Sequence, residues 1–124
     1  MIAGIGIDMI EVGRVQKAIE ADPEFVKSVF AKAEIEYCEA MKRKYQHYAA
    51  RFCAKEAFLK ALGVGMHEGL LFTQIQVVND SSGKPGIILE GKMKDLFEKF
   101  GFSKIFVSLT HLKELAQAFV ILVK

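Results

Sequence analysis

The segment that most constrains the fold is the long helical pattern from Tyr45 to Leu62, which is apolar on two sides. At about 3.6 residues per turn, one narrow stripe of this segment consists only of alanines: Ala50, Ala54, Ala57 and Ala61. The opposite arc carries mostly larger apolar side chains: Tyr48, Ala49, Phe52, Cys53 and Leu59. A helix that is apolar on both sides is buried in a globular protein, and a stripe of alanines lets another backbone approach closely. The pattern therefore predicts a central helix, ended by Gly63 and Gly65, with other elements packed on both sides.

The rest of the chain divides into a helical first half and a strand-rich second half. Apolar residues at helical spacing predict five helices: about 11–21, a short one from Pro23, 34–43, 45–62 and 92–100. Alternating or short apolar runs predict five strands: 2–10, 72–78, 87–89, 104–109 and 116–123. The order β-α-α-α-α-β-β-α-β-β predicts an α+β fold in which antiparallel sheet packs with helices, with residues 1–124 forming one domain.

Charge and cysteine content exclude several classes of protein. The balance of 17 basic against 15 acidic residues gives a net charge of +2, which is too mild to indicate nucleic-acid binding. Cys38 and Cys53 lie in helical patterns without metal-ligand spacing, so we expect buried, apolar thiols in a reducing compartment, with a disulfide as the weaker alternative.

No segment of the sequence is typical of export or membrane insertion. The first ten residues contain an aspartate and lack the basic start of a signal peptide. The apolar run 116–123 is far shorter than the roughly 20 residues that cross a bilayer. We therefore expect a soluble cytoplasmic protein without nucleic-acid or membrane partners.

Asp8 ends the run Gly4-Ile5-Gly6-Ile7-Asp8 in the first predicted strand. The run is not a dinucleotide-binding fingerprint, because the third glycine would fall at Met9. A carboxylate on an apolar strand is costly to bury unless a cation or hydrogen bonds compensate it. Two interpretations stay open here: Asp8 belongs to a cation site, or it caps the following helix.

Glu56 lies within the apolar arc of the central helix, one turn before Lys60. On a solvated face such a pair is commonplace and stabilises a helix by only about 0.2–0.5 kcal/mol. The apolar neighbours indicate burial instead, which requires a stronger reason for both charges. Asp8 and Glu56 together would supply two hard oxygen ligands for Mg²⁺, the rest coming from water and substrate phosphates, and Lys60 would add a positive charge for the same phosphates.

A third group of polar residues, Ser108, Thr110 and His111, lies at the end of a predicted strand. Alternation places Ser108 and Thr110 on one face, and His111 is expected to be the first residue after the strand. These side chains are either structural or phosphate-binding donors. His47 and His67 lack partners at ligand spacing and are expected on the surface.

These blocks, taken together over the whole chain, resemble the holo-acyl-carrier-protein synthase family, the short trimeric branch of the phosphopantetheinyl transferases. The resemblance is carried by the order and spacing of four groups: Gly4 to Asp8 with Glu11 and Arg14; Arg51-Phe52 and Ala54 to Ala57 with Lys60 to Gly63; Asn79-Asp80 with Gly83 to Pro85; and Ser108 to His111. Two departures are small: Ala50 replaces a frequent glycine, and Cys53 replaces a small apolar residue.

The resemblance implies roles for these residues. Asp8 and Glu56 would bind Mg²⁺, and Lys60 would neutralise the coenzyme A diphosphate. Further coenzyme A contacts are implied for Gly63, Gly83, Lys84, Pro85, Ser108, Thr110 and His111. Arg14 would dock an acidic helix of the acyl carrier protein. The family is a homotrimer with its active sites at subunit interfaces.

The activity that the resemblance implies is transfer of 4'-phosphopantetheine from coenzyme A to a serine of apo-acyl carrier protein, with release of 3',5'-ADP, in support of fatty acid biosynthesis. Either Glu56 or a water on the metal would take the serine proton, and the water is favoured because a carboxylate that binds Mg²⁺ is a poor base. Two alternatives are a metal-dependent nucleotide or phosphodiester hydrolase and a non-enzymatic binding subunit.

Overall fold

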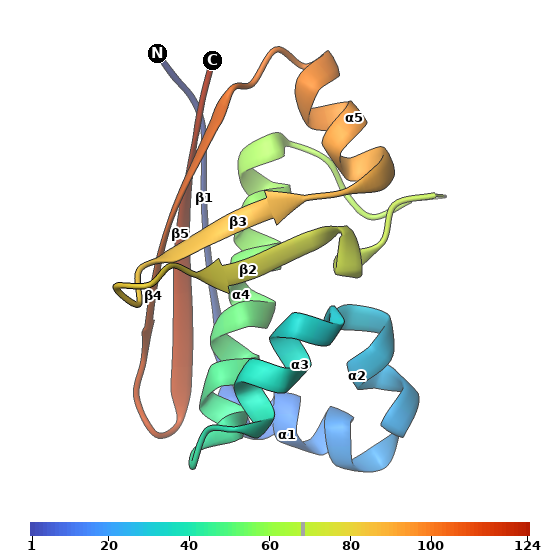
Figure 1. Ribbon diagram of the computed structural model, residues 1–124, viewed down its shortest axis with the longest axis vertical. Coiled ribbons are helices and arrows are strands. Elements are labelled where there is room, and N and C mark those ends of the chain that lie inside the picture. Colours follow the sequence, from blue (N-terminus) through green and yellow to red (C-terminus); the bar gives the residue numbers. More distant parts are fainter. Residues whose placement is uncertain (68) are drawn as a thin grey trace.

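A computed structural model describes residues 1–67 and 69–124 of the chain (Figure 1). Its elements are, in chain order, β1 (Ile2–Glu11), α1 (Val12–Ala21), α2 (Pro23–Val29), α3 (Lys32–Glu39), α4 (Lys44–Leu62), the 3₁₀ turn η1 (Phe72–Gln74), β2 (Ile75–Asn79), β3 (Pro85–Leu89), α5 (Gly91–Lys99), β4 (Lys104–His111) and β5 (Leu115–Val123). Apart from η1, this order confirms the α+β prediction.

The boundaries of β2 and α3 differ from the predicted ones. The strand expected from residue 72 begins only at Ile75, because Leu71 and Gln74 bond to each other and close a 3₁₀ turn first. The helix expected over 34–43 begins at Lys32 and ends at Glu39. Its earlier start is stabilised by Glu34, whose Oε1 accepts a hydrogen bond from the amide of Ala31 at 3.0 Å.

The main sheet has the strand order β1-β5-β4, and both pairs of strands are antiparallel. Figure 1 shows the three strands side by side, with α4 against one face of the sheet. Side chains that alternate toward α4 form the core of this layer, including Ala118 and Val120 of β5. The opposite face, which we call the outer face, exposes apolar side chains: Ile5, Ile7, Met9, Phe106 and Phe119.

The second sheet is the hairpin of β2 and β3, which are paired antiparallel from Ile75 opposite Leu89 to Asn79 opposite Pro85. In Figure 1 the hairpin crosses in front of α4, while α1 to α3 gather at one end of the molecule and α5 at the other. Helix α4 thus lies between the main sheet and the hairpin. This position confirms the prediction of a central helix that is buried on two sides.

Both cysteines are buried and free, as expected from their apolar surroundings. Burial raises the pKa of each thiol to about 12. In the described parts of the chain, no helix is both long and apolar enough to cross a membrane.

Candidate functional site

Strand β1 brings Asp8 to the surface of α4. Its burial alternates, so that Gly4, Gly6 and Asp8 face the helix while the residues between them face outward. A β-carbon at Gly4 would collide with the carbonyl oxygen of Ala61, and one at Gly6 would collide with that of Ala57. The glycines and the alanine stripe therefore let the strand lie directly against the helix, and the next inward residue of the strand is the carboxylate.

The alternative that Asp8 caps a helix is wrong. Helix α1 begins at Val12, and Glu11 occupies its cap position without a side-chain cap bond. Asp8 lies inside β1, opposite Ala118 of β5.

Lys60 meets Asp8 across this strand–helix contact. Its Nζ lies 3.2 Å from Oδ1 of Asp8 and donates to the carbonyl oxygen of Ile7 at 3.0 Å. The Lys60 side chain is 56% exposed and that of Asp8 only 18%. The commonplace pairing of Lys60 with Glu56 is therefore not what the structure has, because the ammonium is hydrogen-bonded to β1.

Glu56 is half-buried at the same place. Burial, followed by the neighbouring charge of Asp8, raises the pKa of Glu56, while Lys60 acts in the opposite direction. Cys53, one turn earlier, donates from Sγ to the carbonyl oxygen of Ala116 at 3.4 Å, and burial together with Asp8 raises its thiol pKa. The structure thus brings together Asp8, Glu56 and Lys60: Asp8 is paired with the ammonium, and Glu56 lies close enough for both charges to act on its pKa.

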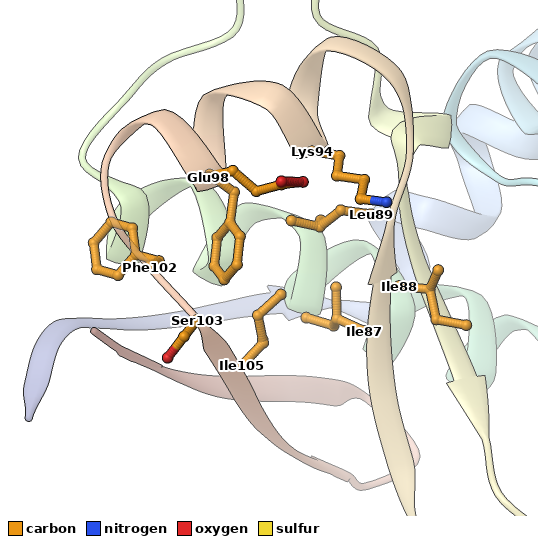
Figure 2. A pocket seen from close by; sticks show the side chains of 9 residues that line it. Ile87, Ile88, Leu89, Lys94, Glu98, Phe102, Ser103 and Ile105 are labelled. Atoms are coloured by element: carbon orange, nitrogen blue, oxygen red, sulfur yellow. The ribbon is translucent and has the colours of Figure 1, made fainter.

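Two hollows lie near these elements. One, of about 300 Å³, is lined by Ile5, Gly6, Ile7, Lys60 and Phe119 and lies beside the ammonium at the β1 edge of the main sheet. The other, of about 540 Å³, lies between β3, α5 and β4 (Figure 2). Figure 2 shows isoleucine and phenylalanine side chains on its floor and Lys94 and Glu98 reaching in from α5. None of the site residues expected from the sequence lines this second cavity.

The loop after α4 and the hairpin turn have the backbone shapes that their glycines allow. Gly63 ends α4 with a φ of 82°. Gly83, with a φ of 89°, donates to the carbonyl oxygen of Asp80 at 2.9 Å. The Asp80 carboxylate accepts from Ser82 and from the amide of Lys84, and these bonds hold its pKa below the ordinary value. Lys84 is exposed, and Pro85 begins β3 half-buried.

The end of β4 differs from the prediction. His111 is the last residue of β4 rather than the first residue after it, because pairing with β5 continues to Ala116. Its Nδ1 lies 2.8 Å from Oε1 of Gln46 on α4. Ser108 and Thr110 are exposed on the opposite face of the strand.

His47 does not behave as the surface residue that we expected. It is half-buried, and its ring lies 5.1 Å from that of His111 and 5.8 Å from that of Tyr37. Burial, then the charges of His111 and Arg51, lowers the pKa of His47. His67 is exposed, as predicted.

Sequence reasoning missed a cationic hollow beside His111. A cavity of about 340 Å³ is lined by Val12, Gln16, Lys42, Arg43, Lys44, Tyr45, Gln46 and Lys113. The signal in the sequence was the run Lys42-Arg43-Lys44, three adjacent cations in a chain of nearly balanced charge. Such a cluster attracts phosphate groups.

The expected site residues thus form two separate groups within one chain. Asp8, Glu56 and Lys60 lie together, whereas the hairpin turn and the end of β4 lie elsewhere. Among the residues that the structure describes, no hydrogen bond joins either of these segments to the two carboxylates or to Lys60.

Comparisons with known proteins cover nearly the whole chain. The family model of the 4'-phosphopantetheinyl transferase superfamily matches residues 4–120. A holo-[acyl-carrier-protein] synthase of Geobacter metallireducens is 46% identical over 98% of each chain. The crystal structure of holo-[acyl-carrier-protein] synthase from Neisseria meningitidis superimposes with a TM-score of 0.91 at 28% identity, and covers 100% of both chains.

A further structure, the holo-(acyl-carrier-protein) synthase from Bacillus anthracis in complex with CoA (3',5'-ADP), is 35% identical. It has a TM-score of 0.80 and covers 98% of this chain and 96% of its own. The family match over nearly the whole chain and these full-length similarities lead to one assignment: the chain belongs to the 4'-phosphopantetheinyl transferase superfamily.

Proposed function

We propose that this chain transfers 4'-phosphopantetheine from coenzyme A to a serine of an apo-acyl carrier protein and releases 3',5'-ADP. The observation that carries the proposal is the convergence of Asp8, Glu56 and Lys60 from β1 and α4 in a member of this superfamily. Relatives named holo-[acyl-carrier-protein] synthase, and the Bacillus anthracis complex with CoA, support the choice of substrates. The setting that we propose is the cytoplasm and fatty acid biosynthesis, and both rest on this resemblance.

The carboxylates fit a divalent cation. Asp8 and Glu56 are close enough for the charge of one to raise the pKa of the other, and a cation between them would relieve that repulsion. Within residues 1–67 and 69–124, no cluster of three or more potential ligands (His, Cys, Asp or Glu) occurs. A set of two carboxylates suits Mg²⁺, which usually keeps several waters and binds substrate phosphates. We therefore propose that Asp8 and Glu56 hold Mg²⁺, which when bound would stabilise charge on the diphosphate oxygens.

The residues of the chain have distinct tasks in the proposed reaction. The serine hydroxyl of the carrier gives its proton to a water or to Glu56. Its oxygen forms a bond to the phosphorus that bears the pantetheine arm, and the bond from that phosphorus to the bridging oxygen breaks, so that 3',5'-ADP leaves. Lys60, at the exposed side of the site, neutralises charge that develops on the phosphate oxygens. Its bond to the Ile7 carbonyl fixes the ammonium beside Asp8 before the substrate arrives.

We propose that the nucleotide end of coenzyme A binds at the second group of residues. The hollow lined by Lys42, Arg43, Lys44 and Lys113 offers positive charge beside His111. Coenzyme A carries a 3'-phosphate at that end, in addition to its diphosphate. The hairpin turn at Gly83 is another proposed contact. Gly63 ends α4 one turn after Lys60, at the other end of the helix from Lys44, so its proposed contact is beside Lys60. The hydroxyls of Ser108 and Thr110 face away from His111, so their proposed contacts are on the outer face.

The outer face supports a proposed homotrimer. Exposed apolar patches of this kind are typical of interfaces between proteins. The hollow beside Lys60 is lined by Ile5, Ile7 and Phe119 of the same face, so a second copy that covers this face would reach Lys60. The separation of the two groups within one chain is explained if a neighbouring copy supplies the second group.

Mixed assemblies would test this arrangement. Glu56→Ala and His111→Ala are expected to be inactive or weak alone but to recover activity after they are unfolded and refolded together, because some interfaces then combine two intact groups. Light scattering should give a mass of three chains, and Phe119→Lys should lower it. If mixing restores nothing while each variant forms the same assembly as the wild type, active sites shared between copies are ruled out.

The decisive test of the function is mass spectrometry of an apo-acyl carrier protein incubated with the chain, coenzyme A and Mg²⁺. A gain of one phosphopantetheine is expected, and EDTA, Asp8→Asn or Glu56→Gln should abolish it. The hydrolase alternative predicts release of 3',5'-ADP from coenzyme A without any carrier. An unmodified carrier would contradict the proposal, and full activity in EDTA would contradict the Mg²⁺ site.

A further inference from the structure

Among residues 1–67 and 69–124, no strand lies along one edge of β2, although that edge is buried, and β2 pairs with β3 alone. The bonds from the Glu90 amide to the Gln74 carbonyl and from the Asp80 amide to the Lys84 carbonyl show that the even-numbered residues of β2 face β3. The amides and carbonyls of Ile75 and Val77 therefore point to the opposite edge. Both residues are fully buried, so these backbone groups require partners.

Two charged side chains supply partners for the Val77 amide and the Ile75 carbonyl, and the Ile75 amide donates to the carbonyl oxygen of Phe72. Oε2 of Glu34 accepts from the amide of Val77 at 3.0 Å, and Nζ of Lys55 donates to the carbonyl oxygen of Ile75 at 2.5 Å. The ammonium and Oε1 of Glu34 are 2.7 Å apart. In a parallel sheet, one residue of the next strand accepts from one amide and donates to the carbonyl two residues earlier. The ion pair makes the same two bonds, and so it takes the place of a missing strand.

The remaining donors and acceptors of the pair are also used. Oε1 of Glu34 accepts from the amide of Ala31 at 3.0 Å, and Nζ of Lys55 donates to the carbonyl oxygen of Phe72 at 3.0 Å. Lys55 thus has three acceptors, as many as the N–H groups of an ammonium. Burial lowers the pKa of Lys55, and the Glu34 carboxylate acts against this shift. Both side chains are 0% exposed. The pair joins α3, α4, η1 and β2 at one point.

A gain in stability does not by itself explain why Glu34 and Lys55 form a buried ion pair. Well-packed apolar residues of similar volume often replace such a pair without loss of stability. Apolar side chains could not, however, bond to the Val77 amide and the Ile75 carbonyl. The geometry of the strand edge is therefore what requires the charges.

We propose that Glu34 and Lys55 are positioning residues, which form a substitute strand edge and thereby hold the β2–β3 hairpin in the place required for coenzyme A. This inference rests on the proposed function. The hairpin carries the turn at Gly83, and β3 forms a wall of the cavity in Figure 2. Lys55 and Glu56 are adjacent on α4. Lys55 contacts the hairpin, whereas Glu56 lies near Asp8 of β1, so the same turn of the helix serves both.

A second set of hydrogen bonds joins α4 to the hairpin near its turn. Arg51, one turn before Lys55 on α4, donates from a guanidinium nitrogen to Oδ1 of Asn79 at 2.6 Å. Asn79 in turn donates from Nδ2 to the carbonyl oxygen of Gly83 at 2.9 Å. The contacts of α4 with the hairpin thus reach from the first residue of β2 to its turn.

The test uses the double variant Glu34→Leu/Lys55→Met, which removes both charges and leaves the strand edge without partners. Lys55→Met alone would bury an unpaired carboxylate and endanger folding. The second variant is therefore Glu34→Gln, whose amide oxygen can still accept from the Lys55 ammonium while its NH2 group faces the Val77 amide. With unpaired edge groups, the KM for coenzyme A should rise about fivefold or more while kcat stays within about twofold. Glu36→Gln, an exposed carboxylate on the same helix, is the matched control and should change neither constant.

Amide hydrogen exchange supplies a readout that does not depend on activity. In the wild type, the Val77 amide should exchange as slowly as that of Val78, which faces β3, and Glu34→Gln should accelerate exchange at Val77 selectively. Fast exchange at Val77 in the wild type would overturn the inference even if neither variant folds.

The outcomes separate the inference from the function on which it rests. If the wild-type chain transfers phosphopantetheine but either folded variant keeps the wild-type KM, or loses stability alone, the positioning role is wrong. If the wild type transfers nothing, the proposed function is wrong and so is the role in coenzyme A binding, while the exchange data still report whether the ion pair holds the strand edge.

Discussion

The ammonium of Lys60 lies 3.2 Å from a carboxylate oxygen of Asp8, a residue 52 positions away on another element, although Glu56 is only one turn away on its own helix. This contact joins the edge strand of the main sheet to the C-terminal half of α4. Within this pair, the Lys60 ammonium lies nearer the surface and the Asp8 carboxylate is more buried.

Replacement of Lys60 should impair the reaction far more than the fold. An exposed ion pair is worth about 0–1 kcal/mol, so Lys60→Met should leave the melting temperature nearly unchanged. Loss of a charge that stabilises the transition state should lower kcat by about 100-fold or more. Single-turnover transfer assays would measure this, with Lys60→Arg as the control that retains a cation. Activity of Lys60→Met within about twofold of the wild type would remove Lys60 from the mechanism.

Without bound Mg²⁺, the ionised Glu56 side chain should lower the stability of the folded protein at neutral pH. Burial and Asp8 raise its folded-state pKa above the ordinary 4.5, so the folded protein keeps a proton that the unfolded chain releases in this window. The free energy of unfolding therefore falls as the pH rises from the unfolded-state pKa to the folded-state pKa of Glu56, and it stays lower at higher pH. Glu56→Gln, which cannot ionise, should melt at a higher temperature than the wild type at neutral pH in EDTA, and this advantage should shrink toward about pH 4.

Thermal melts of both proteins across this pH range would measure the effect, with the exposed Glu36→Gln as the matched control. Added Mg²⁺ should stabilise the wild type but not Glu56→Gln, since binding to the folded state raises its stability. An advantage of Glu56→Gln that grows on acidification would show that the sign of the pKa shift is wrong.

The close approach of β1 to α4 predicts opposite effects for two glycine substitutions. Gly6→Ala places a methyl group against the Ala57 carbonyl and should destabilise the fold by about 1–3 kcal/mol or more. Because the strand must move away, Asp8 should separate from Glu56 and activity should fall beyond the loss of stability. Gly13→Ala has open space within α1 and should stabilise by about 0.4–1 kcal/mol. Chemical denaturation would measure the free energy of unfolding of both variants. Equal values for Gly6→Ala and Gly13→Ala would contradict the close packing of β1 on α4.

Arg14 is exposed on α1, and a role in docking the carrier protein predicts a dependence on salt. Arg14→Ala should weaken binding of an acidic carrier by up to about fivefold at low ionic strength, the range for one exposed ion pair. The difference should shrink as salt increases, because screening shortens the reach of surface charges. Calorimetric titration at two salt concentrations would measure it. Unchanged affinity at low salt would place docking elsewhere on the surface.

Much of the fold could be predicted from local patterns. The alanine stripe of α4 indicated a close neighbour, and that neighbour proved to be the glycine side of β1. Strand ends were less predictable, since His111 belongs to β4 only because β5 continues to pair with it. The 3₁₀ turn before Ile75 is closed by backbone bonds and by a bond from the Leu71 amide to the Gln74 side chain, which periodicity does not reveal.

The candidate site was also predictable only where local sequence decides it. Asp8, Glu56 and Lys60 stood out because charges in apolar surroundings need compensation, which is a property of the local sequence. The pairing of His111 with Gln46, the half-buried position of His47 and the ion pair of Glu34 with Lys55 involve residues far apart in the chain.

Alternation and helical spacing in the sequence were thus enough for the kinds of element, their order and the residues whose charge is out of place. Which of those residues meet was decided by the packing of elements, because Asp8 reaches Lys60 only where Gly6 lets a strand lie against a helix. The same packing buries one edge of β2, and only then does the chain need Glu34 and Lys55 where a strand would otherwise lie.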